Sequence, residues 1–219
     1  MRERRRGVLI SFEGVEGAGK TTQLGLLATR LQGAGKRVVS TREPGGTELG
    51  ERIRLLLLQS SGVAISPWAE LFLYLASRAQ LLQEVIRPAL REGWVVLVDR
   101  YLDATVAYQG YGRGLDIRMV QELNRSVAAD ALPDLTLLLD LEPEAGLDRI
   151  SAPCRDRLEA EEMAFHRRVR EGYLRLSREY PERIKVISAK RPVQEVAAEI
   201  WQHLEPLLSC PGMGKASSA

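Results

Sequence analysis

Five short apolar runs recur along the chain, at residues 8–12, 37–41, 94–99, 135–141 and 184–188. Each run is almost continuously apolar, which is typical of strands that are covered on both faces. Longer segments with helical patterns lie between and after them, at about 20–34, 47–60, 67–92, 116–130, 143–151, 159–180 and 192–208. Because strands that alternate with helices form right-handed crossovers, the pattern predicts an α/β fold, a three-layer sandwich with a five-stranded parallel sheet.

Four segments depart from plain strands and helices. Pro88 falls late in the 67–92 segment and is expected to kink or end that helix near Arg87, because proline lacks the N–H that a helix interior needs. The stretch "YQGYGRGL" (108–115) holds three glycines and is expected to be a mobile loop, and "ISAPCRDRLE" (150–159) is a second mobile candidate. The tail "SCPGMGKASSA" (209–219) has the composition of a disordered end. With no repeat and no linker in the sequence, we expect one domain over residues 1–208 with inserted flaps.

The composition of the 219 residues narrows the class of protein. An apolar share of 45% predicts a globular fold, and a net charge of +2 gives no general reason to expect binding to nucleic acid or membranes. Cys154 and Cys210 cannot form a disulfide framework, which favours a reducing compartment. The charged opening "MRERRRG" is not followed by the apolar stretch of a signal peptide, and no apolar run approaches the ~18 residues of a spanning helix. We therefore expect a cytoplasmic protein, with neither nucleic acid nor a membrane as its partner.

The stretch "GVEGAGKT" at residues 14–21 fits the pattern G-x-x-x-x-G-K-[ST], with a predicted strand before it and a predicted helix after it. Glycines let the backbone wrap so that successive N–H groups point at an anion, and the helix adds its positive N-terminal end. Lys20 can then reach the β- and γ-phosphates, and the Thr21 hydroxyl can bind Mg²⁺. A purely structural turn would need about one glycine and no Lys-Thr pair. We predict a P-loop that binds a nucleoside triphosphate through Gly14, Val15, Glu16, Gly17, Ala18, Gly19, Lys20, Thr21 and Thr22.

A P-loop alone does not distinguish a kinase from a GTPase, a transporter ATPase or a helicase. The sequence holds no N-K-x-D motif that would read guanine, and helicase and transporter motors usually need a longer chain. Residues elsewhere in the chain therefore have to identify the acceptor.

Charged and aromatic residues follow the predicted strands in places where an acceptor could bind. Asp99 ends the third strand, where a carboxylate beside the P-loop holds Mg²⁺-linked water, and Arg100 places a cation next to it. Arg42 precedes a Pro-Gly-Gly turn. Tyr74 and Arg78 are four residues apart and share a helix face, so the ring can stack on a base while the guanidinium donates to a base carbonyl. The structural alternatives are a strand-terminal ion pair, an exposed turn, and a core tyrosine beside a capped arginine.

Taken together, these motifs identify a family. The chain resembles the bacterial thymidylate kinases, which pass the γ-phosphoryl group of ATP to dTMP and yield dTDP and ADP. The resemblance runs from about residue 8 to 205, and it implies a fold of the P-loop NTPase type, a mobile lid at about 149–158, ATP as donor, Mg²⁺ as cofactor and a homodimer. The stretches that carry it are "FEGVEGAGKTT", "TREPGGT", "FLYLASRAQL", "VIRPAL", "VDRY", "AYQGYGRG", "PDLTLLLDLEPEAGLDR", "DRLE" and "YLRL".

The resemblance also implies roles for single residues. Glu16 corresponds to the family's P-loop carboxylate, which lies near the 3′-hydroxyl of the acceptor's sugar. Arg42 and Arg100 correspond to residues around the dTMP phosphate, and Asp99 to the carboxylate near Mg²⁺. Arg78 matches the arginine that bonds the thymine carbonyl. The positions implied to line the base and sugar are Thr105, Tyr108 and its neighbour Gln109; the Tyr108 ring leaves no room for a ribose 2′-hydroxyl.

This sequence departs from the family pattern at two places. The base-stacking position, four residues before the arginine, usually holds Phe but here holds Tyr74, whose hydroxyl needs a partner if it is buried. Members with glycine at the position of Gly17 usually supply the catalytic arginine from the lid. We therefore expect Arg149 or Arg155 to reach the ATP phosphates, and Arg157 to brace the lid.

Two other functions compete with this interpretation. One is a P-loop kinase for another nucleotide or for a nucleoside, and the other is a non-catalytic module that binds ATP or nucleic acid. The stretches "TREPGG" and "YQGYGRG" argue against the first. His166 and His203 show no metal-binding spacing, and we interpret both as structural or surface residues.

Overall fold

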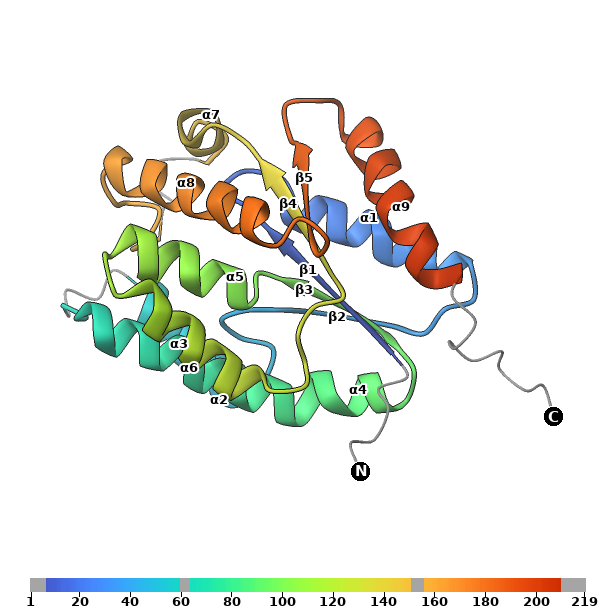
Figure 1. The fold of residues 1–219 in the computed structure, drawn as a ribbon, viewed down its shortest axis with the longest axis horizontal. Coiled ribbons are helices and arrows are strands. Elements are labelled where there is room, and N and C mark those ends of the chain that lie inside the picture. The colour runs from blue at the N-terminus through green and yellow to red at the C-terminus, as the bar shows by residue number, and fades with distance from the viewer. Residues whose placement is uncertain (1–6, 60–63, 151–155, 210–219) are drawn as a thin grey trace.

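The computed structural model describes residues 7–59, 64–150 and 156–209. Within these residues the strands form one five-stranded parallel sheet in the order β2-β3-β1-β4-β5 (Figure 1). The strands are β1 (Val8–Glu13), β2 (Val38–Arg42), β3 (Val95–Asp99), β4 (Leu135–Asp140) and β5 (Ile184–Ser188). All five predicted strands are therefore confirmed, with ends that differ by at most one residue.

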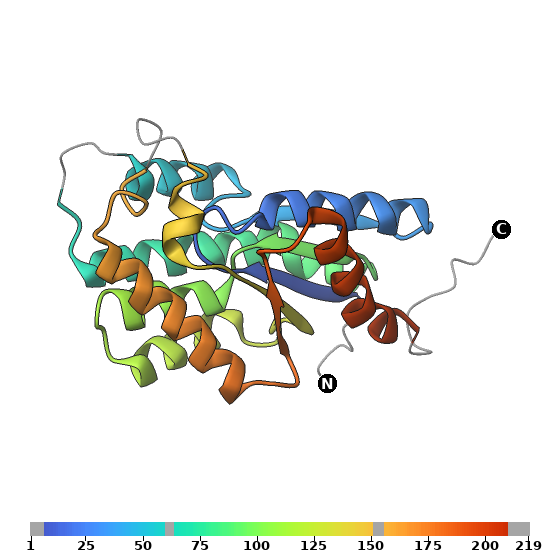
Figure 2. The same ribbon diagram turned by 90° about the horizontal axis from the view of Figure 1, so that it is seen from above.

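Helices cover both faces of the sheet and give the predicted three layers (Figure 2). One face carries α1 (Lys20–Gly33) and α9 (Val193–Ser209), which pack on each other. Along β1 the apolar residues Val8, Ile10 and Phe12 belong to the core on this face. The other helices are α2 (Glu48–Leu58), α3 (Pro67–Leu81), α4 (Arg87–Arg91), α5 (Leu102–Thr105), α6 (Ile117–Ala128), α7 (Pro143–Leu147) and α8 (Met163–Glu179).

The opposite face of the sheet packs on the helical segment that was predicted over 67–92. Leu9 of β1 lies in the core on this side with Leu82 and Leu90, which come from that segment. Because Leu9 alternates with Val8 and Ile10, this strand is covered on both faces, as its unbroken apolar sequence predicts. No helix among the described residues has the length and apolar character needed to cross a membrane.

The helix does not end near Arg87, so one of the two outcomes predicted for Pro88, an end rather than a kink, is wrong. The α3 helix passes into a π-helical segment, η1 (Leu82–Ile86), and α4 continues to Arg91. Pro88 lies in the first turn of α4, where a missing N–H is tolerated. The π-helical turn just before it changes the hydrogen-bond register, so the chain carries the proline without breaking.

The stretch 108–115 is not a mobile loop, which corrects a second prediction. Most of it forms a buried π-helical segment, η2 (Val106–Gly112), directly after α5. Its glycines allow close packing: a Cβ on Gly110 would lie 2.7 Å from Ile117, and one on Gly112 would lie 2.7 Å from Phe165. Glycine therefore marks tight contact with α6 and α8 here, not freedom of movement.

Several boundaries and predictions fall near the gaps in the structure. The helix predicted over 143–151 ends at Leu147, and the one predicted over 159–180 begins at Met163. The lid predicted at 149–158 is described only at its two ends. Arg155 and the 210–219 part of the predicted tail lie outside the described residues, as do Cys154 and Cys210.

Candidate active site

The P-loop, residues 14–21, turns from the end of β1 into the start of α1. Gly14, Gly17 and Gly19 have φ angles of 138°, 66° and 86°, which side chains rarely allow. Lys20 is the first residue of α1 and is buried, and its Nζ donates to the carbonyl oxygens of Gly14 at 3.1 Å and Val15 at 2.8 Å. Burial, with the nearby Arg100 adding to it, lowers the pKa of Lys20 to about 8. The loop therefore holds the partly desolvated ammonium group of Lys20 against its own backbone carbonyl groups.

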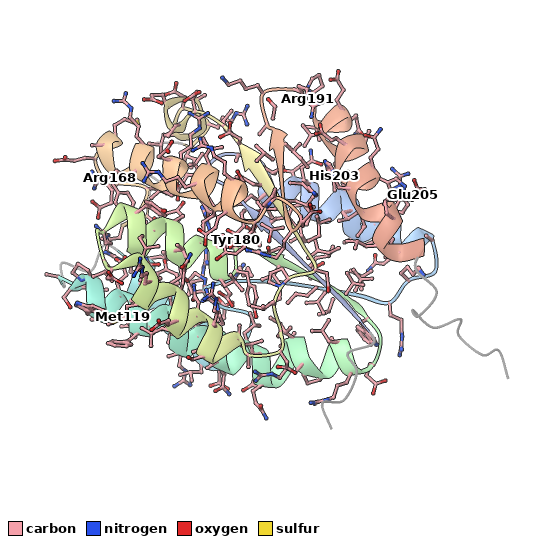
Figure 3. All side chains as sticks on the ribbon, viewed as in Figure 1. Met119, Arg168, Tyr180, Arg191, His203 and Glu205 are labelled. Atoms are coloured by element: carbon pink, nitrogen blue, oxygen red, sulfur yellow. The ribbon has the colours of Figure 1, made fainter. Side chains whose placement is uncertain are left out.

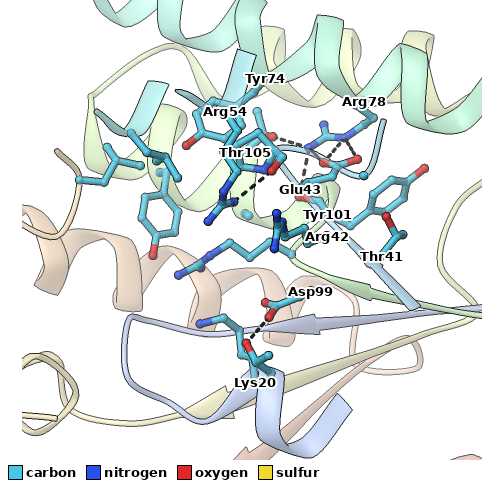
Figure 4. A pocket seen from close by; sticks show the side chains of 18 of the residues that line it. Lys20, Thr41, Arg42, Glu43, Arg54, Tyr74, Arg78, Asp99, Tyr101 and Thr105 are labelled. Atoms are coloured by element: carbon cyan, nitrogen blue, oxygen red, sulfur yellow. Dashed lines mark hydrogen bonds and ion pairs between the residues drawn. The ribbon is translucent and has the colours of Figure 1, made fainter. Parts of the chain in front are cut away.

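The neighbouring strand β3 places Asp99 against the start of α1. Thr21 Oγ1 donates to Asp99 Oδ2 at 2.6 Å, so the two predicted magnesium ligands lie side by side (Figure 4). Both are oxygen donors, the type that Mg²⁺ prefers. Across the described ranges no group of three or more His, Cys, Asp or Glu could hold a metal. This pair suits Mg²⁺ that takes its remaining ligands from phosphate and water.

Arg100 turns back over the P-loop. Its φ is 65°, a left-handed conformation that is unusual for a non-glycine residue, and its N–H donates to Phe12 O at 2.9 Å. Its Nη1 donates to Gly14 O at 2.7 Å, and its Nη2 lies 3.1 Å from Glu16 Oε1. The guanidinium therefore joins the P-loop backbone to the P-loop carboxylate.

Glu16 is the buried carboxylate at the centre of the site. Its Oε1 accepts hydrogen bonds from Arg100 and from the Tyr108 hydroxyl, while its Oε2 lies 3.4 Å from Nδ1 of His166. Burial alone would raise the pKa of Glu16, but the contact with His166 and the charges of Arg100 and Lys20 hold it well below its usual value. Glu16 is therefore ionised and able to accept a hydrogen bond from a ligand.

A second buried carboxylate, Glu13, lies beneath the loop. Its Oε1 accepts from Tyr101 N at 2.8 Å, and its Oε2 accepts from the Tyr173 hydroxyl at 2.9 Å. Burial and the neighbouring Asp103 raise the pKa of Glu13 to about 8, although Arg100 opposes the rise. Glu13 therefore supports the loop from below without adding a full charge at neutral pH.

Arg78 is almost fully buried, at 1% exposure, and is held from several sides. Nε and Nη2 donate to the Glu43 carboxylate, and Nη2 also donates to Thr105 Oγ1 at 2.8 Å (Figure 4). Nη1 donates to Asn124 Oδ1 at 2.5 Å. Burial raises the pKa of Glu43, and the charge and hydrogen bonds of Arg78 oppose that rise. These contacts use all but one of the guanidinium hydrogens, which leaves one Nη1 hydrogen for a ligand.

One cavity of about 800 Å³ joins the P-loop to these residues. Figure 4 shows Lys20 and Asp99 on one side of it and Tyr74, Arg78 and Thr105 on the other. Thr22 is exposed on α1 and does not line the cavity, whereas Val15 and Ala18 are buried in the core. The structure brings the remaining predicted substrate-binding residues together on its wall: Arg42, Tyr74, Arg78, Arg100, Thr105, Tyr108 and Gln109.

Two arginines line the cavity near the end of β2. Arg42, which the sequence predicted, donates through Nη2 to Glu51 Oε1 at 3.1 Å and Oε2 at 3.0 Å, and about half of its side chain is exposed. Arg54 was missed, and it lies on α2 with its Nη1 donating to Pro44 O at 3.0 Å. No local sequence signal distinguishes Arg54 from other helix-surface arginines.

At the start of the predicted lid, Arg149 reaches the P-loop directly. Its Nη1 donates to Gly17 O at 3.0 Å. A side chain at position 17 would have no room, because a Cβ there would lie 2.1 Å from Gly146 O in α7. The packing thus excludes an arginine at position 17, and Arg149 from the start of the predicted lid lies beside the loop instead.

Arg157 lies at the other end of the predicted lid, and its contacts are of the kind expected for a bracing residue. Its Nε donates to Leu57 O at 2.7 Å, and its Nη2 donates to Glu70 Oε2 at 2.5 Å. The fully buried Glu70 also accepts from Gln109 and Arg113. The Glu70 carboxylate therefore connects Arg157 to Gln109 on the cavity wall.

The two histidines differ in their surroundings. His203 lies on α9, where it is partly exposed, and it does not line the cavity (Figure 3). His166 is fully buried against Glu16, which a purely structural interpretation does not anticipate. Glu13 and Tyr173 fall within the quoted stretches "FEGVEGAGKTT" and "YLRL", but no role was predicted for either, and Glu43 stood out only as a neighbour of Arg42 in "TREPGG".

Comparisons with known proteins identify the family to which the chain is similar. A sequence model of the family described as thymidylate kinase matches residues 12–200. A thymidylate kinase of Syntrophotalea carbinolica is 50% identical over 93% of this chain and 97% of its own length, and one of Deinococcus radiodurans is 51% identical over 90% and 95%. The crystal structure of a thymidylate kinase from Ehrlichia chaffeensis superposes with a TM-score of 0.74 at 35% identity, covering 91% of this chain and 98% of the other.

Proposed function

Since the chain belongs to the thymidylate kinase family and transfers the γ-phosphoryl group of ATP to dTMP, we propose that one end of its cavity binds the donor and the other end binds the acceptor. The observation that carries this division is the continuous cavity, which has the P-loop lysine at one end and the buried Arg78 at the other. ADP and dTDP are the products.

The donor end is built from the P-loop. Its backbone N–H groups and the start of α1 bind the phosphates of ATP, and Lys20 exchanges its two carbonyl contacts for the β- and γ-phosphates. Thr21 and Asp99 hold Mg²⁺, which when bound neutralises charge on the phosphate oxygens. Their hydroxyl and carboxylate oxygens already lie in hydrogen-bond contact.

The acceptor end recognises the base and the sugar. The remaining Nη1 hydrogen of Arg78 donates to a thymine carbonyl, Tyr74 stacks on the base, and Thr105 borders it. Tyr108 and Gln109 pack along the deoxyribose, and the Glu16 carboxylate, which lines the cavity, accepts from its 3′-hydroxyl. Arg42 and Arg100 bind the dTMP phosphate, and Arg54 adds a third cation on the same wall.

The chemical step requires alignment and charge compensation more than covalent participation. An oxygen of the dTMP phosphate attacks the γ-phosphorus, and the bond to the β–γ bridging oxygen breaks as ADP leaves. Arg100 stands between the P-loop and the acceptor, and Arg149 lies on the P-loop at Gly17, so both compensate charge on the moving group. Arg155 remains a further candidate from the lid. A closed lid keeps out the water that would otherwise hydrolyse ATP.

A coupled assay of ADP release with ATP, Mg²⁺ and a panel of nucleoside monophosphates tests this assignment. We expect rapid turnover with dTMP, slow turnover with dUMP, because one methyl group is worth only about 1–3 kcal/mol, and very slow turnover with dCMP, which presents an amino group to Arg78. Equal rates with dCMP and dTMP would contradict the base-binding role of Arg78. Nucleosides in the same panel test the alternative that the acceptor is not a monophosphate.

We also propose that the protein forms a homodimer through α2 and α3. These helices pack together and expose large apolar side chains: Leu55, Leu56, Trp68 and Phe72. Light scattering after size exclusion should report a dimer that Phe72→Glu dissociates, whereas Val186→Glu on β5 should leave it intact. A wild-type monomer would refute the proposal. The single domain over 1–208 and the cytoplasmic location stay predictions.

A further inference from the structure

We propose that His166 is a positioning residue for Glu16, and through it for the sugar 3′-hydroxyl of the acceptor. This inference rests on the proposed contact between Glu16 and the 3′-hydroxyl. His166 does not line the cavity itself, so it acts on the substrate only through the carboxylate.

The position of His166 follows from the packing of α8. The helix turns its apolar side toward η2 and the sheet, and Phe165 and Val169 are buried on either side of the histidine. The His166 ring is fully buried and packs edge-on against the Phe165 ring, with centroids 5.5 Å apart and an interplanar angle of 83°. Its Nδ1 lies 3.4 Å from Glu16 Oε2. The ring therefore has a fixed place behind the P-loop carboxylate.

The fold gives no reason for an imidazole at this place. Neither ring nitrogen of His166 has a hydrogen-bond partner among the described residues, and both are buried. Unpartnered buried nitrogens destabilise a fold, whereas a phenylalanine would fill similar space without that cost. The contact between its Nδ1 and the ionised carboxylate of Glu16 explains why a histidine occupies this position.

The two oxygens of Glu16 are used differently. Oε1 accepts from the Arg100 guanidinium and the Tyr108 hydroxyl, whereas Oε2 lies 3.4 Å from His166 Nδ1 and lacks a hydrogen-bond partner in the described part of the chain. Oε2 is also shielded from solvent, so His166 supports the carboxylate from behind, and the 3′-hydroxyl approaches the carboxylate from the cavity that Glu16 lines. The contact of 3.4 Å is longer than a hydrogen bond, and such contacts often shorten once substrate is bound. An N–H at Nδ1 then fixes the rotation of the carboxylate about its last bond.

A cycle that combines variants with two substrates tests this role. The substrates are dTMP and 3′-deoxy-dTMP, and the variants are His166→Phe, His166→Asn and, as a surface control, His203→Phe. Wild type should use dTMP more efficiently in kcat/KM than the 3′-deoxy analogue, by about 10- to 100-fold for a hydrogen bond to a charged group. His166→Phe should lower kcat/KM for dTMP about tenfold. It should leave kcat/KM for the 3′-deoxy analogue and the KM for ATP unchanged, so that the preference for dTMP over the analogue shrinks. His166→Asn, whose amide nitrogen lies near the Nδ1 position, should restore part of the preference for dTMP. His203→Phe should show the same preference as wild type.

Three other results would contradict this role of His166. If His166→Phe lowers the efficiency with both substrates equally while its melting temperature is normal, His166 only packs against the loop. If His166→Phe does not fold, the preference measured for His166→Asn decides, and a value no better than that of a Glu16→Gln variant contradicts the proposal. If wild type does not distinguish the two substrates, the role of Glu16 and this inference both fail, although the phosphorylation of dTMP stands.

Discussion

Gly146 lies where α7 crosses the P-loop, and replacing it with alanine tests whether this crossing sets the position of the loop. A Cβ on Gly146 would lie 2.2 Å from the carbonyl oxygen of Glu16, whereas real Cβ atoms essentially never come within 3.0 Å and usually stay beyond 3.4 Å. The Glu16 backbone or α7 would therefore have to move by roughly 1 Å. Because an error of about 1 Å in placing catalytic groups can cost about 100-fold in rate, we expect Gly146→Ala to lower kcat by about that factor. Its stability should fall by about 1–3 kcal/mol from overpacking.

The measurement is ADP release at saturating ATP and dTMP, together with thermal unfolding of the same samples. Gly25→Ala on α1 is the matched control, because a Cβ there meets nothing within 4 Å. The control should keep wild-type turnover and gain up to about 1 kcal/mol from helix propensity. A folded Gly146→Ala enzyme that turns over at the wild-type rate would refute the reasoning, since it would show that α7 can yield without moving the P-loop.

Three further outcomes follow from the buried charges. Lys20→Ala should lower turnover by several orders of magnitude with an unchanged circular dichroism spectrum, and near-normal dTMP phosphorylation would contradict the role of this lysine. Glu43→Ala leaves the Arg78 guanidinium buried without its carboxylate, so urea unfolding should show a loss of about 3–5 kcal/mol; a loss below about 1 kcal/mol would show that water replaces the carboxylate. The pKa of Glu13 is raised from 4.5 to about 8, so the stability that this group contributes is fully present below pH 4.5 and declines as pH rises through about 8. The stability of Glu13→Gln relative to wild type should therefore rise between pH 5 and pH 8 in urea unfolding, and a constant difference would exclude a raised pKa.

The sheet and the P-loop could be predicted because their signals are local. Each strand is a short apolar run of its own, and the loop's glycines, Lys20 and Thr21 are contiguous. The order of the strands is not local information, and it is the pairing of β1 with β3 that brings Asp99 to Thr21.

The rest of the site depends on contacts between distant segments. Arg78 and Tyr108 were predicted to face the acceptor, but nothing near Arg78 in the sequence shows that Glu43 would hold it, 35 positions away. His166 likewise meets Glu16 only because α8 packs on η2. The stretch 108–115 was misjudged because glycine favours both mobile loops and close helix packing, and only the contacts of Gly110 and Gly112 distinguish the two.

The unbroken cavity between Lys20 and Arg78 has a consequence for inhibition. A single molecule that joins two nucleosides through a chain of phosphates would fill both halves at once. It would lose its translational freedom only once on binding, so its affinity should exceed that of either nucleotide alone by far more than the added contacts explain. The phosphate-chain length that gives the tightest binding would then measure the distance between the donor and acceptor nucleosides in this enzyme.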